Sequence, residues 1–239
     1  MRKRKYLIGA MLGVLGALVV SGTAMAGQPI AHKLTATIAP AKQDKKKFGG
    51  ASEHLITDTT YDNFTASPSS KTALFTFSKD IKFVNGNLPA CPQSSLQTAT
   101  TTAAVQSACG ASIVGTGTAL VNDGQSPFTS PNPVLLVGGG PNVLYVWVRI
   151  ANATTVVLNG QINPSAHTLL ITGLPNTPGI DLTIFDTQLN KKKTGKKSFY
   201  FMARCGKKKK WVTTEVVTFQ NGQQLTATTT QKCKQKPSK

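Results

Sequence analysis

Polar and apolar residues alternate along most of this chain, which is the pattern of half-buried β-strands. The segment 143–150 is a clear example, because Leu144, Val146, Val148 and Ile150 form one aliphatic face and the residues between them form the other. Clusters of Pro, Gly and Asn separate many of the alternating segments. The pattern predicts strands at roughly 33–39, 53–58, 72–78, 112–121, 133–137, 142–150, 154–162, 167–172, 179–188, 198–204, 211–219 and 224–232.

Short strands at this spacing are typical of a β-sandwich or a barrel. Threonine, which suits a pleated half-exposed face, accounts for 31 of the 239 residues. We expect an all-β fold, a single β-sandwich that is immunoglobulin-like or related, over residues 51–233. Residues 27–50 are expected to be a flexible basic segment with one candidate strand, and residues 234–239 a basic tail.

The last predicted hairpin surrounds Asn221-Gly222. A two-residue loop there would place Val217 and Leu225 on opposite faces of the hairpin. A three-residue loop with Gly222 in the left-handed conformation places both on one face. Because burial favours the second arrangement, we predict a type I turn with a bulge at Gly222.

The segment between Cys91 and Cys109 is the one predicted helical insertion, covering about residues 92–109. A continuous helix would hold these cysteines about 27 Å apart, whereas a disulfide requires Cα atoms within about 7 Å. Clustered threonines at 98–102 are poor helix formers. If the cysteines pair, we therefore expect two short helical turns folded back on each other.

The first 26 residues have the three parts of a secretory signal peptide. Arg2 to Lys5 are basic, an apolar stretch runs from Tyr6 to Val20, and Ala24-Met25-Ala26 supplies small residues before Gly27. A spanning helix needs about 20 apolar residues, and glycines interrupt this shorter stretch. We expect cleavage, export, and no membrane span in the mature chain.

Export gives the four cysteines an oxidising environment in which they should pair. Four cysteines allow three pairings, and closeness in sequence favours Cys91–Cys109 and Cys205–Cys233. The second pair presents a difficulty. If Cys205 and Cys233 flank the strand that begins at Trp211, two strand spacings separate them by about 9.5 Å. The tail at Cys233 must then curl across, or the bridge must join two sheets.

Several short elements resemble a group of uncharacterised secreted proteins from high-GC actinobacteria. The similarity covers about residues 72–233, and its elements are Leu88-Pro89-Ala90-Cys91, Cys109-Gly110 leading to the segment 113–119, Ala203-Arg204-Cys205, and Phe219 through Gly222 to Cys233. The resemblance implies export and a cysteine-containing, immunoglobulin-like β-sandwich. It brings no activity, cofactor or catalytic residue.

The chain has 27 lysines and arginines against 9 acids, and such an excess attracts anionic polymers. A seven-residue strand over 198–204 would span about 23 Å, so the two lysine runs beside it should lie at opposite ends of the domain. That separation favours diffuse, salt-screened adhesion over a nucleic-acid groove, and lysines that merely solubilise loops are the alternative. The candidate anion-binding residues are Lys191, Lys192, Lys193, Lys196, Lys197, Lys207, Lys208, Lys209 and Lys210.

A second candidate surface lies on the outer face of the segment 143–150. Tyr145 and Trp147 could stack on a ligand there, and Arg149 could contact an anion. The alternative interpretation is that a loop or a neighbouring strand covers these aromatic side chains.

Most catalytic motifs are missing from the sequence. It contains no Gly-x-Ser-x-Gly element, no Cys-x-x-Cys pair and no phosphate-binding loop. His54 with Asp58 or Asp62 is the one conceivable start of a catalytic triad. Glu53, Asp58, Asp62 and Asp80 form the only acidic cluster, a weak candidate for calcium. We expect no catalytic residue, cofactor or metal site.

The leading hypothesis is an exported, non-catalytic protein that adheres to an anionic cell-wall polymer or an extracellular polysaccharide. A carrier that holds an apolar ligand between two sheets is the first alternative, favoured by the aliphatic segments 134–137, 144–150 and 168–171. An unrecognised secreted hydrolase is the second alternative. Nucleic-acid binding, if present, would be non-specific.

Overall fold

The computed structural model describes residues 29–62, 68–122, 131–150, 154–176 and 181–237, and it confirms an all-β fold. No helix in these residues is both long and apolar enough to cross a membrane. The main strands are β1 (Pro29–Ala39), β4 (Ser52–Tyr61), β5 (Ser70–Phe77), β7 (Ile113–Asn122), β8 (Asn132–Gly140), β9 (Val143–Ile150), β10 (Thr154–Asn163), β11 (Thr168–Thr172), β12 (Asp181–Leu189), β14 (Lys210–Phe219) and β15 (Gln224–Lys232).

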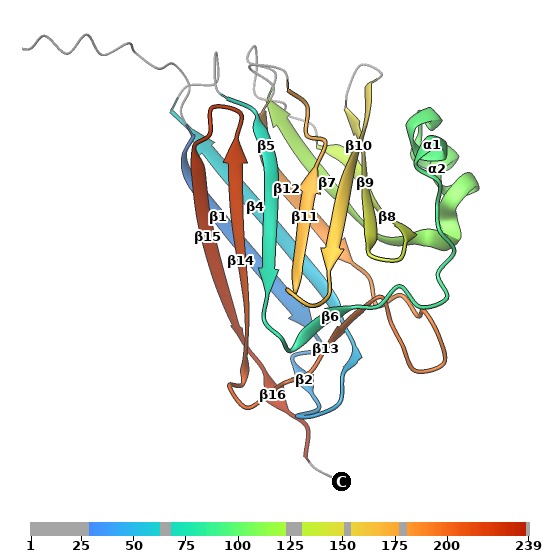
Figure 1. Cartoon of the computed structure of the whole chain (residues 1–239), viewed down its shortest axis with the longest axis vertical. Coiled ribbons are helices and arrows are strands. Elements are labelled where there is room, and N and C mark those ends of the chain that lie inside the picture. The colour runs from blue at the N-terminus through green and yellow to red at the C-terminus, as the bar shows by residue number, and fades with distance from the viewer. Residues whose placement is uncertain (1–28, 63–67, 123–130, 151–153, 177–180, 238–239) are drawn as a thin grey trace, which may run out of the picture.

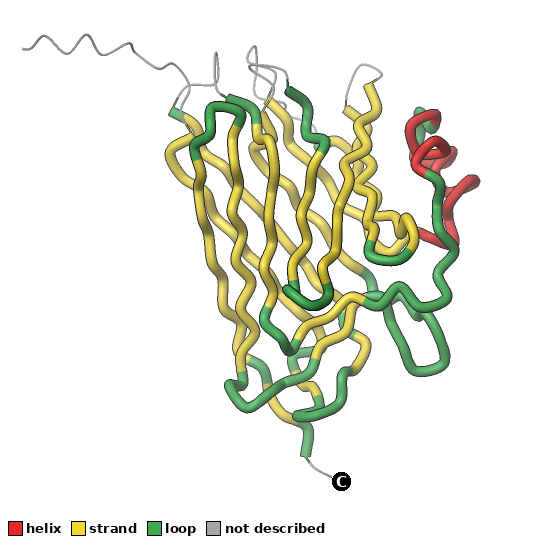
Figure 2. The backbone as a smooth tube through the Cα atoms, viewed as in Figure 1, coloured by secondary structure: helices red, strands yellow, loops and turns green. Residues whose placement is uncertain are grey.

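These eleven strands form one antiparallel sheet in the order β1-β4-β12-β7-β8-β9-β10-β11-β5-β14-β15. The sheet curls until its two edge strands lie side by side, so it is nearly closed into a barrel (Figures 1 and 2). The expected sandwich is not confirmed, because β11 pairs with β5 and makes the sheet continuous. The candidate strand at 33–39 is part of β1, which pairs with β4 along its whole length.

Side chains close the seam between β1 and β15, since no backbone ladder joins these strands in the described residues. Gln231 on β15 binds both backbone groups of Ile38, accepting from its N–H at 2.6 Å and donating to its carbonyl oxygen at 3.0 Å. Gln223 donates to the carbonyl oxygen of Pro29 at 2.9 Å. Inside the barrel, His32 on β1 pairs with Glu215 on β14 at 2.8 Å.

Replacing Gln231 with leucine should lower the free energy of unfolding by about 1 to 3 kcal/mol, because it leaves two backbone groups of Ile38 without partners. Chemical denaturation followed by fluorescence measures this change. Gln224→Leu is the matched control, because Gln224 is exposed and its side-chain amide donates to the hydroxyl of Thr218 on the neighbouring strand. Equal effects of the two substitutions would show that the amide bridge does not hold the seam.

Short strands close one end of the barrel, and we call this end the floor. It comprises residues 40–50, 78–84, 190–210 and 232–237. Its strands are β2 (Lys42–Gln43), β3 (Gly49–Gly50), β6 (Ile81–Phe83), β13 (Phe201–Ala203) and β16 (Lys234–Gln235), which form the sheets β3-β13-β6 and β16-β2. Phe83 packs edge to face against Tyr200, Phe201 and Phe77 at centroid distances of 5.3–6.0 Å. These rings seal the barrel interior from the floor side.

The predicted helical insertion is confirmed. It consists of α1 (Gln93–Thr98), α2 (Thr102–Cys109) and a 3-10 turn (Gly110–Ser112). Thr101 caps α2 by accepting a hydrogen bond from the amide of Ala104, and the break between the helices allows Cys91 and Cys109 to form a disulfide. The two helices cover the outer face of β8 and β9.

The last hairpin also has the predicted register. Val217 lies opposite Leu225, and the amide of Gly222, whose φ is +85°, donates to the carbonyl oxygen of Phe219. A left-handed residue at this position suits glycine, which lacks a Cβ. The hairpin therefore directs Val217 and Phe219 into the barrel core.

Candidate functional site

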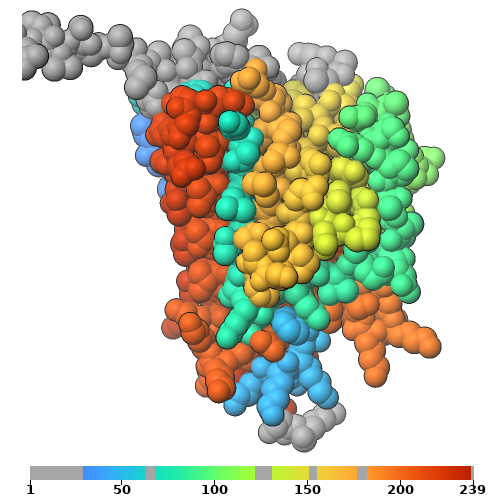
Figure 3. Space-filling model, viewed as in Figure 1, coloured from blue at the N-terminus to red at the C-terminus, as the bar shows by residue number. Residues whose placement is uncertain are grey.

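Most of the positive charge of the protein lies on the floor. The floor ranges contain 19 of the 27 lysines and arginines but only two acids, Asp44 and Asp80. In Figure 3 the floor segments around residue 45 (blue) and around residues 190–210 (orange) gather at the lower end of the molecule. The cations are Lys42, Lys45, Lys46, Lys47, Lys79, Lys82, Lys191, Lys192, Lys193, Lys196, Lys197, Arg204, Lys207, Lys208, Lys209, Lys210, Lys232, Lys234 and Lys236.

The two lysine runs share this end, and the expectation that they lie at opposite ends is wrong. The reason is that β13 has three residues and not seven, and it runs across the floor between β3 and β6. Residues 190–200 form a projecting loop instead of a strand, held by a bridge between Lys193 and Phe199. Both runs therefore contribute to one basic end.

The second disulfide holds the floor segments together. Cys205 and Cys233 have Cα atoms 5.8 Å apart, because residues 204–209 turn back below β14. The amide of Cys205 donates to the carbonyl oxygen of Asp44 at 2.8 Å. The amide of Cys233 donates to the carbonyl oxygen of Lys209 at 3.0 Å. The expected 9.5 Å separation is avoided, and three basic segments are fixed next to one another.

Both acids of the floor are engaged locally. Asp80 accepts a hydrogen bond from Nε of Arg204 at 2.7 Å, and Arg204 and Lys82 lie over the ring of Phe48 at 4.7 and 4.6 Å. Asp44 accepts bonds from the amides of Lys47 and Lys46, which lower the pKa of its carboxyl. Almost all the lysines of the floor remain exposed to solvent.

An open groove of about 520 Å³ lies beside the projecting loop. Lys192, Lys193 and Lys196 line one side of it, and Leu88 and Pro89 line the other. Gly86 brings the two sides close, because a Cβ at this position, where φ is +56°, would collide with the carbonyl oxygen of Thr194. The groove combines positive charge with an apolar wall.

The candidate aromatic surface does not form. Trp147 is 0% exposed beneath α1 and α2, and its indole nitrogen donates to the carbonyl oxygen of Ala99 at 3.3 Å. Arg149 contacts the hydroxyl of Thr155 at 3.4 Å, and Tyr145 is half-buried. The helical insertion supplies the cover that the alternative interpretation required.

The structure separates the proposed acidic cluster. Glu53 and Asp58 both lie on β4 but on opposite faces, Glu53 inside the barrel and Asp58 outside, and Asp80 belongs to the floor. His54 pairs with Asp186 at 2.7 Å on the outer surface, and not with Asp58 or Asp62. No group of three or more metal-binding side chains occurs in the part of the chain that the structure describes.

A hydroxyl, an imidazole and a carboxylate form a row inside the barrel. His32 Nδ1 lies 2.9 Å from the hydroxyl oxygen of Thr59, and His32 Nε2 lies 2.8 Å from Glu215. Burial raises the pKa of Glu215, and the hydrogen bond and charge of His32 partly oppose this shift. These groups satisfy one another across the seam, so the row holds β1 against β14.

Sequence reasoning missed several floor residues. Lys42, Lys79, Lys82, Lys232, Lys234 and Lys236 stand alone or in short groups in the sequence, and the fold brings them to the same end. These lysines share one feature in the sequence, which is that each lies close to the end of a predicted strand or in the loop beside it. Strand pairing is needed to show that these termini coincide.

Comparisons with known proteins give no identification. No protein-family model matches the sequence, and no curated protein matches it. The fold and the charge distribution are therefore the basis for assigning a function.

Proposed function

We propose that this is an exported, non-catalytic β-protein that adheres through its floor to an anionic polymer of the cell envelope or extracellular matrix. The observation that carries this proposal is the gathering of 19 cations and two acids at one end of the molecule. Two disulfides are typical of an oxidising, extracytoplasmic environment. The predicted signal peptide, residues 1–26, lies outside the described residues and provides the route of export.

A polymer with regularly spaced negative charges suits this surface better than a small anion. The lysines are exposed and distributed over several segments, so each contact is weak and many contacts act together. Binding of this kind releases counterions and weakens steeply as salt rises. The groove beside Lys192 and Lys196 gives the polymer chain a defined place on the floor.

The proposal is tested by retention of the purified protein on isolated cell walls over a series of salt concentrations. Lys196→Gln with Lys197→Gln removes two exposed charges from the floor, and Lys33→Gln with Lys71→Gln removes two exposed charges from β1 and β5. We expect the floor variant to lower the slope of log affinity against log salt by about 2, and the control variant to change it by less than about 0.5. Equal changes of the slope in the two variants would contradict binding through the floor. Absence of salt-sensitive retention would overturn the proposal.

A further inference from the structure

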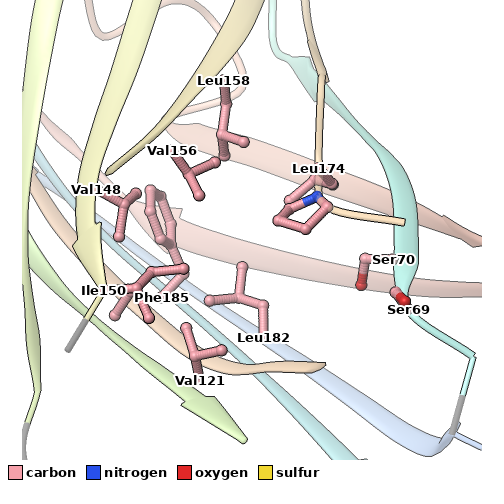
Figure 4. Close-up of a pocket in the computed structure, with 12 residues that line it drawn as sticks. Ser69, Ser70, Val121, Val148, Ile150, Val156, Leu158, Leu174, Leu182 and Phe185 are labelled. Carbon is pink, nitrogen blue, oxygen red and sulfur yellow. The ribbon is translucent and has the colours of Figure 1, made fainter. Parts of the chain in front are cut away.

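The barrel interior contains a row of three cavities of about 40 Å³ each. Neighbouring cavities share lining residues, and Phe185 lines all three. The first and second cavities also share Leu158, Leu174 and Leu182, and the second and third share Phe75, Val146 and Ile171. The cavities therefore form one interrupted channel, whose first part is shown in Figure 4.

The channel is narrow and follows the barrel lengthwise. Along β9 its lining passes from Leu144 through Val146 and Val148 to Ile150, a distance of about 20 Å at strand spacing. At the Ile150 end, Leu174 and Leu182 are partly exposed. At the other end the aromatic rings above the floor close the channel.

The lining favours an apolar occupant over most of its length. The exception is the second cavity, where His32, Thr59 and Glu215 also line the wall but are hydrogen-bonded to one another. The first cavity is aliphatic apart from Phe185, Ser69 and Ser70 (Figure 4). Apolar cavities of this kind stay dry and accept apolar molecules. Leu158, Leu174 and Leu182 separate the first two cavities, and Phe75, Val146, Ile171 and Phe185 separate the second from the third. A slender chain needs only small rotations of these side chains to occupy the row, whereas a fused ring system needs them to move apart.

One polar group at the closed end has no partner. Glu53 is 2% exposed and lines the third cavity, and its Oε1 has no hydrogen-bond partner among the described residues. Burial raises its pKa to about 8, so the carboxyl is protonated at neutral pH and can donate an O–H. Buried groups without a partner are rare in folded proteins, and a ligand oxygen at this point would satisfy Glu53.

We propose that the channel binds a slender apolar chain that ends in one neutral oxygen, a hydroxyl or a carbonyl, which accepts a hydrogen bond from Glu53. The chain would lie along β9 with its polar end toward the floor and its apolar end toward Leu174 and Leu182. This site is independent of the adhesive floor, because it lies inside the barrel and uses none of the lysines.

The test is titration of the full mature protein with 1-decanol and with decane, followed by NMR of the labelled methyl groups. We expect 1-decanol to shift the methyl signals of Val146, Leu158 and Ile171, and to leave those of Val216, on the outer face of β14, unchanged. Decane should bind about tenfold more weakly, because it cannot accept the hydrogen bond. Equal shifts inside and outside the barrel, or no shift up to the solubility limit, would overturn the proposal.

The pH dependence of binding tests the role of Glu53 separately. Affinity of the native protein for 1-decanol should fall about tenfold between pH 7 and pH 9.5, as the carboxyl loses its proton. Glu53→Gln keeps a donor and should bind equally at both pH values, whereas Glu53→Leu should bind about tenfold more weakly at pH 7. Identical affinities for all three proteins at both pH values would contradict the assignment of Glu53, whatever the result on cell walls.

Discussion

Replacing Glu53 with glutamine should raise the free energy of unfolding by about 4 kcal/mol at pH 9 and by about 1 kcal/mol or less at pH 5. Burial raises the pKa of Glu53 to about 8 in the folded protein, against 4.5 for a glutamate exposed to water. Between these two values the folded state holds a proton that the unfolded state has lost, so stability falls as pH rises from about 4.5 and the loss is complete above about 8. Glutamine has the same shape and no proton to lose, and it removes this dependence.

Denaturant unfolding at a series of pH values, followed by the fluorescence of Trp147 and Trp211, measures the effect. Asp58→Asn is the matched control, because Asp58 lies on the same strand and is half-buried instead of enclosed. The comparison isolates the effect of enclosing the carboxyl, because both substitutions remove one acid from β4. A Glu53→Gln curve that ran parallel to the native one would show that Glu53 ionises freely in the fold.

Removing the Cys205–Cys233 disulfide by a double substitution to serine should lower the free energy of unfolding by about 3.5 kcal/mol, because the bridge closes a loop with a sequence separation of 28 residues. The same change should release the segments 204–209 and 232–237 from one another. We therefore expect faster hydrogen exchange in these two segments and weaker retention on cell walls at moderate salt.

The other disulfide provides the control for this result. Cys91 and Cys109 are 18 residues apart, so their removal should cost nearly as much, about 3 kcal/mol. Its structural effect should centre on α1, α2 and the adjoining Leu88–Pro89 wall of the groove, and should leave the segments 204–209 and 232–237 in place. If both double substitutions reduced retention equally, the joining of the segments 204–209 and 232–237 would have no special part in adhesion.

Local features of this fold could be predicted from the sequence with good accuracy. Alternation located nearly every main strand, the threonine cluster located the break between α1 and α2, and burial of Val217 and Leu225 fixed the last hairpin. Both disulfides joined the cysteines that are close in sequence. Each of these predictions depends on residues fewer than about 30 positions apart.

The long-range arrangement could not be predicted in this way. Periodicity assigns faces to a strand but does not identify its neighbours, and the choice between a sandwich and a barrel depends on the pairing of β5 with β11 and β14. The sequence groups Glu53 with Asp58 and Asp62 in an acidic cluster and does not show that Glu53 faces inward. Both faces of β4 carry polar side chains, so the pattern does not show which face is buried.

The separation of charge along the barrel gives the molecule a strong electric dipole, which should orient it before contact with any negatively charged layer. The floor would then arrive first, and the end where β1 begins would point away into solution. The C-terminal strand β16 belongs to the floor, so a fluorescent label attached after it would lie between the protein and the anionic layer. A label attached ahead of β1 would remain exposed to solvent. Comparing the fluorescence quenching of the two labels on an anionic layer would therefore show the orientation of the bound protein.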